Sequence, residues 1–142
     1  MWKDDAWILD MLNACRRIER YAQGVSGASF LGDELRQDAI VRQLTILGEA
    51  AKRVSPEYRT AHAEIPWQRI AGFRDVVVHQ YERVDLPRVW QIVTEDLVRL
   101  TAQLALLSHR TGRSYPGPQS LRTAPPSLLP LPSSLLSSIS GT

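Results

Sequence analysis

Four side chains able to do chemistry lie within the segment GFRDVVVHQYERVD, residues 72 to 85. Arg74 and Asp75 precede three consecutive valines, and His79 and Tyr81 follow them. A histidine titrates near neutrality and can transfer a proton, whereas an arginine offers several planar donors to an anion. Either the four residues form one site, or they are surface residues that flank a buried valine run.

Helix geometry narrows this choice without settling it. At about 100° per residue, Asp75 and His79 share a helix face, where the carboxylate can orient the imidazole. Arg74 and His79 point about 140° apart on an ideal helix. Convergence of all four groups needs a helix that ends near His79, or a cleft lined from two sides, such as a dimer seam. Spacing by itself therefore favours a structural role, an ion pair together with capping.

Apolar residues at steps of three and four predict the helices that must carry this segment. A first helix is expected from about residue 3 to 22, with a buried stripe of Trp7, Ile8, Met11, Leu12, Cys15, Ile18 and Tyr21. The glycine-containing segment QGVSGASFLGD ends it. A second helix is expected from about residue 33 to 54, with these residues inward: Leu35, Ala39, Ile40, Leu44, Leu47, Ala51 and Val54.

Serine and proline residues mark where the next helical segments start. Ser55 and Pro56 stop the second helix and begin a short helical turn, with the serine as cap and the proline at the first position. Pro66 and Trp67 open a third helical region, which leads into the quoted segment.

A long final helix follows, capped by Asp85 and with Pro87 in its first turn. Its inward residues are expected to be Val89, Trp90, Ile92, Val93, Leu97, Leu100, Leu104 and Leu107. The valine run has strand propensity, but a lone strand would leave its backbone unpaired, so it is assigned to a helix. The predicted fold class is all-α, an up-and-down helical bundle of four main helices.

Composition divides the chain into two parts near Gly112. Residues 1–110 hold the helical pattern, whereas residues 111–142 contain eight serines, six prolines, three glycines and no acidic residue. We expect a disordered tail there. The first 110 residues carry 15 basic and 15 acidic side chains, so the sequence does not indicate a general basic surface for nucleic acid.

Several other classes of site are excluded or disfavoured. Cys15 is the single cysteine, so an intrachain disulfide and a cysteine-based zinc site are impossible. His62 and His109 lack ligand spacing with His79, and no metal site is expected.

The start MWKDDAWILD does not resemble a signal peptide, and no apolar run is long enough to span a membrane, which favours a cytoplasmic protein.

The segment RDVVVHQY resembles the Arg-x4-His-x-Tyr motif of HepT-like toxins, a branch of the HEPN superfamily. The similarity extends to DAIVRQLTILGEAAKRVS at residues 38–55 and IPWQRIAGFRDVVVHQY at residues 65–81, in the order and spacing of that family. It covers roughly residues 4 to 107 and leaves the tail unmatched.

This resemblance implies a HEPN-like bundle that acts as a metal-independent endoribonuclease without a cofactor, the toxin of a type VII toxin–antitoxin pair. It implies a homodimer in which both motifs meet at one cleft, which removes the geometric difficulty. Arg74 and His79 would be catalytic, with Asp75 holding His79 in place. Tyr81 would be the residue that a minimal nucleotidyltransferase antitoxin modifies with AMP, and the added charge would block RNA.

Three more residues can support the motif. Gly48 is expected to permit close helix approach, and Trp67 to pack beneath the motif helix. Glu49 is either a solvated charge or a partner for an arginine such as Arg74.

The alternative function is a non-catalytic helical module that docks a nucleotidyltransferase, which would leave the pairing of Arg74 with His79 unexplained.

Overall fold

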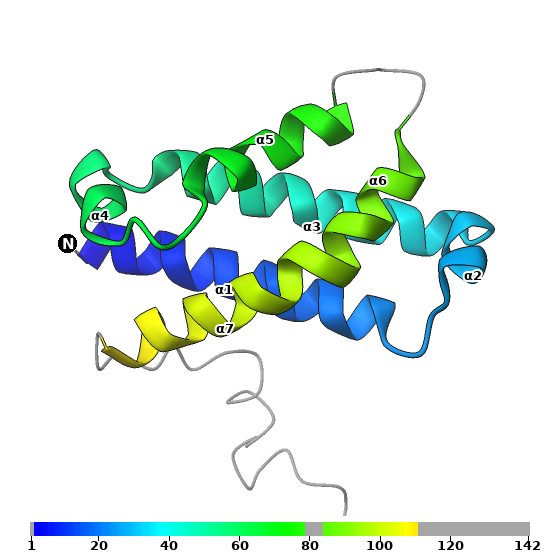
Figure 1. Ribbon diagram of the computed structural model, residues 1–142, viewed down its shortest axis with the longest axis horizontal. Helices are drawn as coiled ribbons and strands as arrows, with labels where there is room; N and C mark the ends of the chain where they lie inside the picture. Colours follow the sequence, from blue (N-terminus) through cyan, green and yellow to red (C-terminus); the bar gives the residue numbers. More distant parts are fainter. Residues whose placement is uncertain (1, 79–83, 111–142) are drawn as a thin grey trace, which may run out of the picture.

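A computed structural model describes residues 2–78 and 84–110 of the chain, and these residues are helical with no strand among them (Figure 1). The main helices are α1 (Trp2–Ala22), α3 (Glu34–Arg53) and α5 (Trp67–Val78). A continuous final helix consists of α6 (Leu86–Gln91), a π-helical turn η1 (Ile92–Asp96) and α7 (Leu97–Arg110). The predicted all-α bundle of four main helices is confirmed.

The core lies where α1 meets α3 and α7, and α5 packs on the other side of α3. Figure 1 shows α3 between α1 and α5, with the final helix crossing the bundle. The largest fully buried side chains come from every main helix: Met11, Ile18, Ile40, Leu44, Leu47, Ile70, Ile92, Leu97 and Leu104. Because all of these belong to one cluster, α5 is anchored on a common core rather than on a separate lobe.

Side-chain caps fix the ends of the shorter elements as the sequence predicts. The short helix α4 (Pro56–Ala61) begins after Ser55, whose hydroxyl accepts from the Tyr58 backbone N–H at 3.2 Å. Asp85 caps α6 by accepting from the Arg88 backbone N–H at 3.1 Å. Such caps satisfy backbone donors that the first turn of a helix leaves unpaired. The starts of α4 and α6, the helices before and after α5, are therefore encoded locally.

The segment between α1 and α3 contains a helix that the pattern did not predict. Helix α2 (Gly27–Leu31) is capped by Ser26 and places Phe30 fully inside the core. Phe30 stacks on Trp90 of α6 with ring centroids 4.9 Å apart. A five-residue helix is too short to show an apolar period, which explains why the glycines alone suggested a simple break.

Two inward assignments on α3 were wrong or incomplete. Leu35 is 83% exposed, and Ala39 is only partly buried, whereas Ile40 and the later predicted residues of this helix are buried. The spacing of Leu35 fits the buried stripe, but it lies in the first turn of α3. The core does not extend to that end of the helix.

Some predictions lie outside the described residues. They concern His79, Tyr81 and the tail at residues 111–142. None of the helices in the described ranges has the length and apolar character that a membrane span requires.

Candidate functional site

Arg74 is placed by the closest approach of α5 to α3. A Cβ atom added to Gly48 of α3 would lie 3.2 Å from the carbonyl oxygen of Ile70 and 3.4 Å from Cβ of Arg74. The distance to the carbonyl oxygen of Ile70 is tighter than most contacts of a real Cβ atom, whereas the distance to Arg74 is at the close end of ordinary van der Waals contact. The lack of a side chain at Gly48 therefore lets the two helix backbones approach at the first residue of the motif.

The guanidinium of Arg74 forms an ion pair with Glu49, the residue after Gly48, through Nη1 and Oε1. Of the two arrangements that the sequence left open for Glu49, a solvated charge or a partner for Arg74, the structure has the partner. The side chains of Arg74 and Glu49 are 43% and 37% exposed, so the pair lies at the surface of the α3–α5 contact. Its position leaves guanidinium surface free for an incoming anion.

Helix α5 presents different chemistry on its two sides. Ile70 and Phe73 are buried, and Trp67 is 8% exposed with its indole N–H donating to the carbonyl oxygen of His62 at 2.9 Å. Trp67 is therefore part of the core, as predicted. Asp75 is exposed, on the side of α5 away from that core. Arg74 lies between the two sides.

His79 and Tyr81 immediately follow the described part of α5, which ends at Val78. The structure therefore places Arg74, Asp75 and Glu49 but not the other two predicted site residues. His79 lies one residue beyond the described end of α5, five residues after Arg74.

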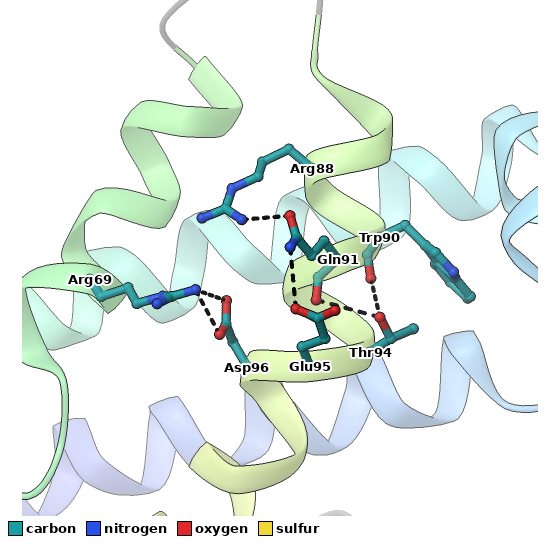
Figure 2. A network of polar contacts seen from close by, with 7 residues as sticks. All are labelled: Arg69, Arg88, Trp90, Gln91, Thr94, Glu95 and Asp96. Carbon is teal, nitrogen blue, oxygen red and sulfur yellow. Dashed lines mark hydrogen bonds and ion pairs between the residues drawn. The ribbon is translucent and has the colours of Figure 1, made fainter.

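Polar contacts that the sequence did not reveal lie along the final helix, and one of them joins this helix to α5 (Figure 2). Nη2 of Arg69 contacts both carboxylate oxygens of Asp96, at 2.9 and 3.0 Å. On the final helix itself, Arg88 donates to Gln91 at 2.7 Å, and Gln91 donates to Glu95 at 3.3 Å. Arg69 and Asp96 are 27 positions apart in the sequence, so no local sequence pattern predicts their contact.

Other reactive groups in the described ranges do not form a second site. No group of three or more histidine, cysteine or acidic residues is placed to bind a metal ion in residues 2–78 and 84–110. Cys15 is fully buried, and burial raises the pKa of its thiol to about 12. A thiol in that environment stays protonated and unreactive at neutral pH, so Cys15 is a core residue, as predicted.

Comparison with known proteins agrees with the family resemblance of the sequence. A family model described as Ribonuclease HepT-like matches residues 11–107. The protein named "Probable ribonuclease HepT" of Thermococcus cleftensis is 34% identical over 101 residues, which is 71% of this chain and 92% of that relative. The protein named "Putative RNase TTE0752" of Caldanaerobacter subterraneus subsp. tengcongensis is 33% identical over 94 residues, 66% of this chain and 84% of that relative.

No solved structure matches the chain. The matched residues run from the middle of α1 to near the end of α7, and they include α3, α5 and the whole segment from Arg74 to Tyr81. The chain therefore belongs to the ribonuclease HepT-like family.

Proposed function

We propose that this chain is a metal-independent endoribonuclease and the toxin of a toxin–antitoxin pair, with Arg74 and His79 as its catalytic residues. The observation that carries the proposal is the placement of Arg74. Its guanidinium is half-exposed, held by Glu49 and positioned by the Gly48 contact, and Arg74 lies five residues before His79 in the sequence. An arginine fixed in this way is suited to bind a phosphate whose negative charge increases during reaction.

His79 supplies the proton transfers. It takes the proton from an RNA 2′-hydroxyl while that oxygen attacks the adjacent phosphorus. The bond from phosphorus to the 5′-oxygen then breaks, and the departing oxygen receives a proton from an imidazolium. The products are a 2′,3′-cyclic phosphate and a 5′-hydroxyl, so this step consumes no water.

Asp75 and Glu49 have supporting roles in this scheme. Asp75 is four residues before His79, the spacing at which a carboxylate can orient an imidazole on one helix face. Glu49 fixes the guanidinium of Arg74, which limits the freedom that the arginine loses when RNA binds. Both are positioning residues rather than proton donors.

The proposed active form is a homodimer. On a single regular helix, the directions of Arg74 and His79 diverge by about 140°. A cleft between two subunits contains two copies of each residue, so an arginine and a histidine from different motifs can face one phosphate.

The proposed control acts at Tyr81, two residues after His79. A minimal nucleotidyltransferase transfers AMP from ATP to the tyrosine hydroxyl and releases pyrophosphate. The added phosphate places negative charge beside Arg74, where it competes with RNA for the same guanidinium. The modified toxin is then inactive.

Cleavage of RNA by the purified chain in the presence of EDTA tests the proposed chemistry. Fragments that end in a 2′,3′-cyclic phosphate are expected, and Arg74→Ala should lose the activity while keeping its helical circular dichroism. Cleavage that requires a divalent metal ion, or fragments that carry a linear 3′-phosphate from the start, would contradict the mechanism. If no RNA is cut although the chain binds a nucleotidyltransferase, the protein is the binding module instead.

Intact-mass analysis tests the proposed control. Incubation with a partner nucleotidyltransferase, ATP and Mg²⁺ should add one or more AMP units to the chain and stop cleavage. Tyr81→Phe should remain active and unmodified, because its hydroxyl is neither acid nor base in the scheme. Modification of the Tyr81→Phe variant would show that AMP is attached to a residue other than Tyr81.

A further inference from the structure

Helix α5 is joined to the bundle on two flanks. One flank packs on α3, where Gly48 permits the close approach that positions Arg74. On the other flank, Arg69 reaches the final helix and binds Asp96. Figure 2 shows these two side chains extending toward each other from α5 and the final helix.

A second contact ties the same stripe of the final helix to the chain just before α5. The side-chain amide of Gln103 donates to the carbonyl oxygen of Glu64 at 3.1 Å. Asp96 and Gln103 are seven residues apart, which places them on one helix face. The entrance to α5 is therefore held at Glu64, and its first turn is held at Arg69.

Asp96, which makes the contact with Arg69, lies in the π-helical turn. Asp96 is the last residue of η1, and the backbone N–H of the next residue, Leu97, donates to the carbonyl oxygen of Ile92 five residues earlier. A π-helical turn closes its hydrogen bond over five residues rather than four, and such turns are among the places where helices kink. Such turns inside α-helices are frequent at functional sites.

We propose that Arg69 and Asp96 are positioning residues for the motif, because their ion pair sets how α5 lies between α3 and the final helix. This inference rests on the proposed ribonuclease function. Arg74 is five residues after Arg69 on the same rigid helix, and the segment with His79 runs between the end of α5 and the start of α6. A change in the tilt of α5 therefore moves Arg74 relative to the rest of the bundle.

A purely structural role predicts something different. The Arg69 side chain is 51% exposed and Asp96 is 20% exposed, and ion pairs at such partly solvated positions contribute little to global stability. If the pair acts only on stability, its removal changes the melting temperature slightly and leaves turnover unchanged. If it positions α5, removal lowers turnover more than melting temperature, since catalysis is sensitive to displacements of about an ångström.

Three full-length variants distinguish these roles. Asp96→Asn removes the carboxylate charge, and the double variant Arg69→Asp with Asp96→Arg reverses the pair. The matched control is Glu95→Gln on the same helical turn, because Glu95 contacts Gln91 of its own helix and not α5. Hydrogen exchange of the α5 amides is measured together with kcat and KM for RNA cleavage.

Asp96→Asn should speed amide exchange in residues 67–78 and lower kcat about tenfold or more, with KM for RNA within about twofold of the parent. The reversed pair should recover most of the lost turnover, and Glu95→Gln should behave like the parent. Unchanged exchange in α5, or equal effects of Asp96→Asn and Glu95→Gln, would overturn the inference. If the parent does not cut RNA, the proposed function fails, and the exchange data alone still decide whether the pair positions α5.

Discussion

The ion pair between Arg74 and Glu49 changes what Arg74 can contribute to a reaction. A free arginine side chain loses considerable rotamer entropy when it binds a phosphate. Glu49 holds the guanidinium in place before RNA arrives, while the half-exposed position of the pair keeps donors accessible. Glu49 also competes with RNA, because its carboxylate and the RNA phosphate attract the same guanidinium.

Replacement of Arg74 tests whether geometry or charge matters. Arg74→Lys keeps the charge but lacks the planar set of donors that can bind two phosphate oxygens. We expect Arg74→Ala to reduce kcat/KM by about a hundred- to a thousandfold and Arg74→Lys to recover only part of that loss. Initial rates on one RNA, at equal helical content, check this. Full activity of the lysine variant would show that charge alone suffices.

At the level of the helices, the approach of α3 to α5 depends on Gly48. In Gly48→Ala the new Cβ would crowd backbone atoms of α5, and α5 would have to move by a few tenths of an ångström. We expect a net loss of stability of about 1 kcal/mol, because overpacking exceeds the usual benefit of alanine in a helix. The rate of RNA cleavage should fall as well, since Arg74 lies at the contact between Gly48 and α5. Urea unfolding and RNA cleavage measure the two effects.

Gly72 of α5 provides the matched control, because a Cβ there meets no atom within 4 Å. Gly72→Ala should stabilise the protein by about 0.5–1 kcal/mol through helix propensity alone. If Gly48→Ala stabilises the protein as much as Gly72→Ala does, the two helices are not in close contact at that point.

Asp4 connects the start of α1 to the cap of α4. Its carboxylate accepts from the backbone N–H of Ser55 at 2.8 Å and from the Ser55 hydroxyl at 2.7 Å. Burial favours the neutral acid, but these two hydrogen bonds outweigh it and lower the pKa of Asp4. A lowered pKa in the folded state stabilises the protein above the unfolded pKa of about 4, and that stabilisation is lost as pH falls through the folded value.

Asp4→Asn should therefore cost about 1–2 kcal/mol at neutral pH, and the difference from the parent should shrink as pH falls below about 4. Denaturant unfolding at pH 7, 5 and 3 measures this, with exposed Asp10→Asn as the control. A difference that is constant over this pH range would mean that the charge of Asp4 does not contribute.

The sequence predicts long helices better than short ones. Helices α1, α3 and the final helix have apolar periods that extend over several turns. The bounds of α1 and α3 agree with the expected residues to within one position, and the final helix starts directly after its expected cap, Asp85. Helix α2 lacks such a period. The π-helical turn also gave no signal, since the spacing of Val89, Val93 and Leu97 fits an uninterrupted α-helix. Helix α2 is held by a tertiary contact, the stacking of its Phe30 on Trp90.

For the whole molecule, the candidate site was only partly predictable. The motif identifies Arg74, Asp75, His79 and Tyr81 because they are close in the chain. The ion pair of Arg74 with Glu49 joins residues 25 positions apart, and its formation depends on how α5 packs on α3. Composition and helical period cannot choose between a solvated and a paired Glu49, whereas the packed structure does.

The proposed cleft requires two chains, so the mass of the active species is a prediction about the whole molecule. Light scattering should give about twice the chain mass of 16.0 kDa. Deletion of residues 111–142 should leave the protein dimeric and the cleavage rate unchanged, because the tail sequence lacks an apolar helical face that a partner could bury. A chain that is monomeric at micromolar concentration and still cuts RNA would contradict the two-motif cleft.

The most direct measurement is the rate of RNA cleavage by His79→Ala beside the parent, in EDTA and at equal dimer concentration. Removal of a positioned acid or base typically lowers a rate by about a hundred- to ten-thousandfold. We predict a loss in that range with the helical content and the dimer mass unchanged. A His79→Ala variant that cuts RNA as fast as the parent would show that the motif is not the active site of this protein.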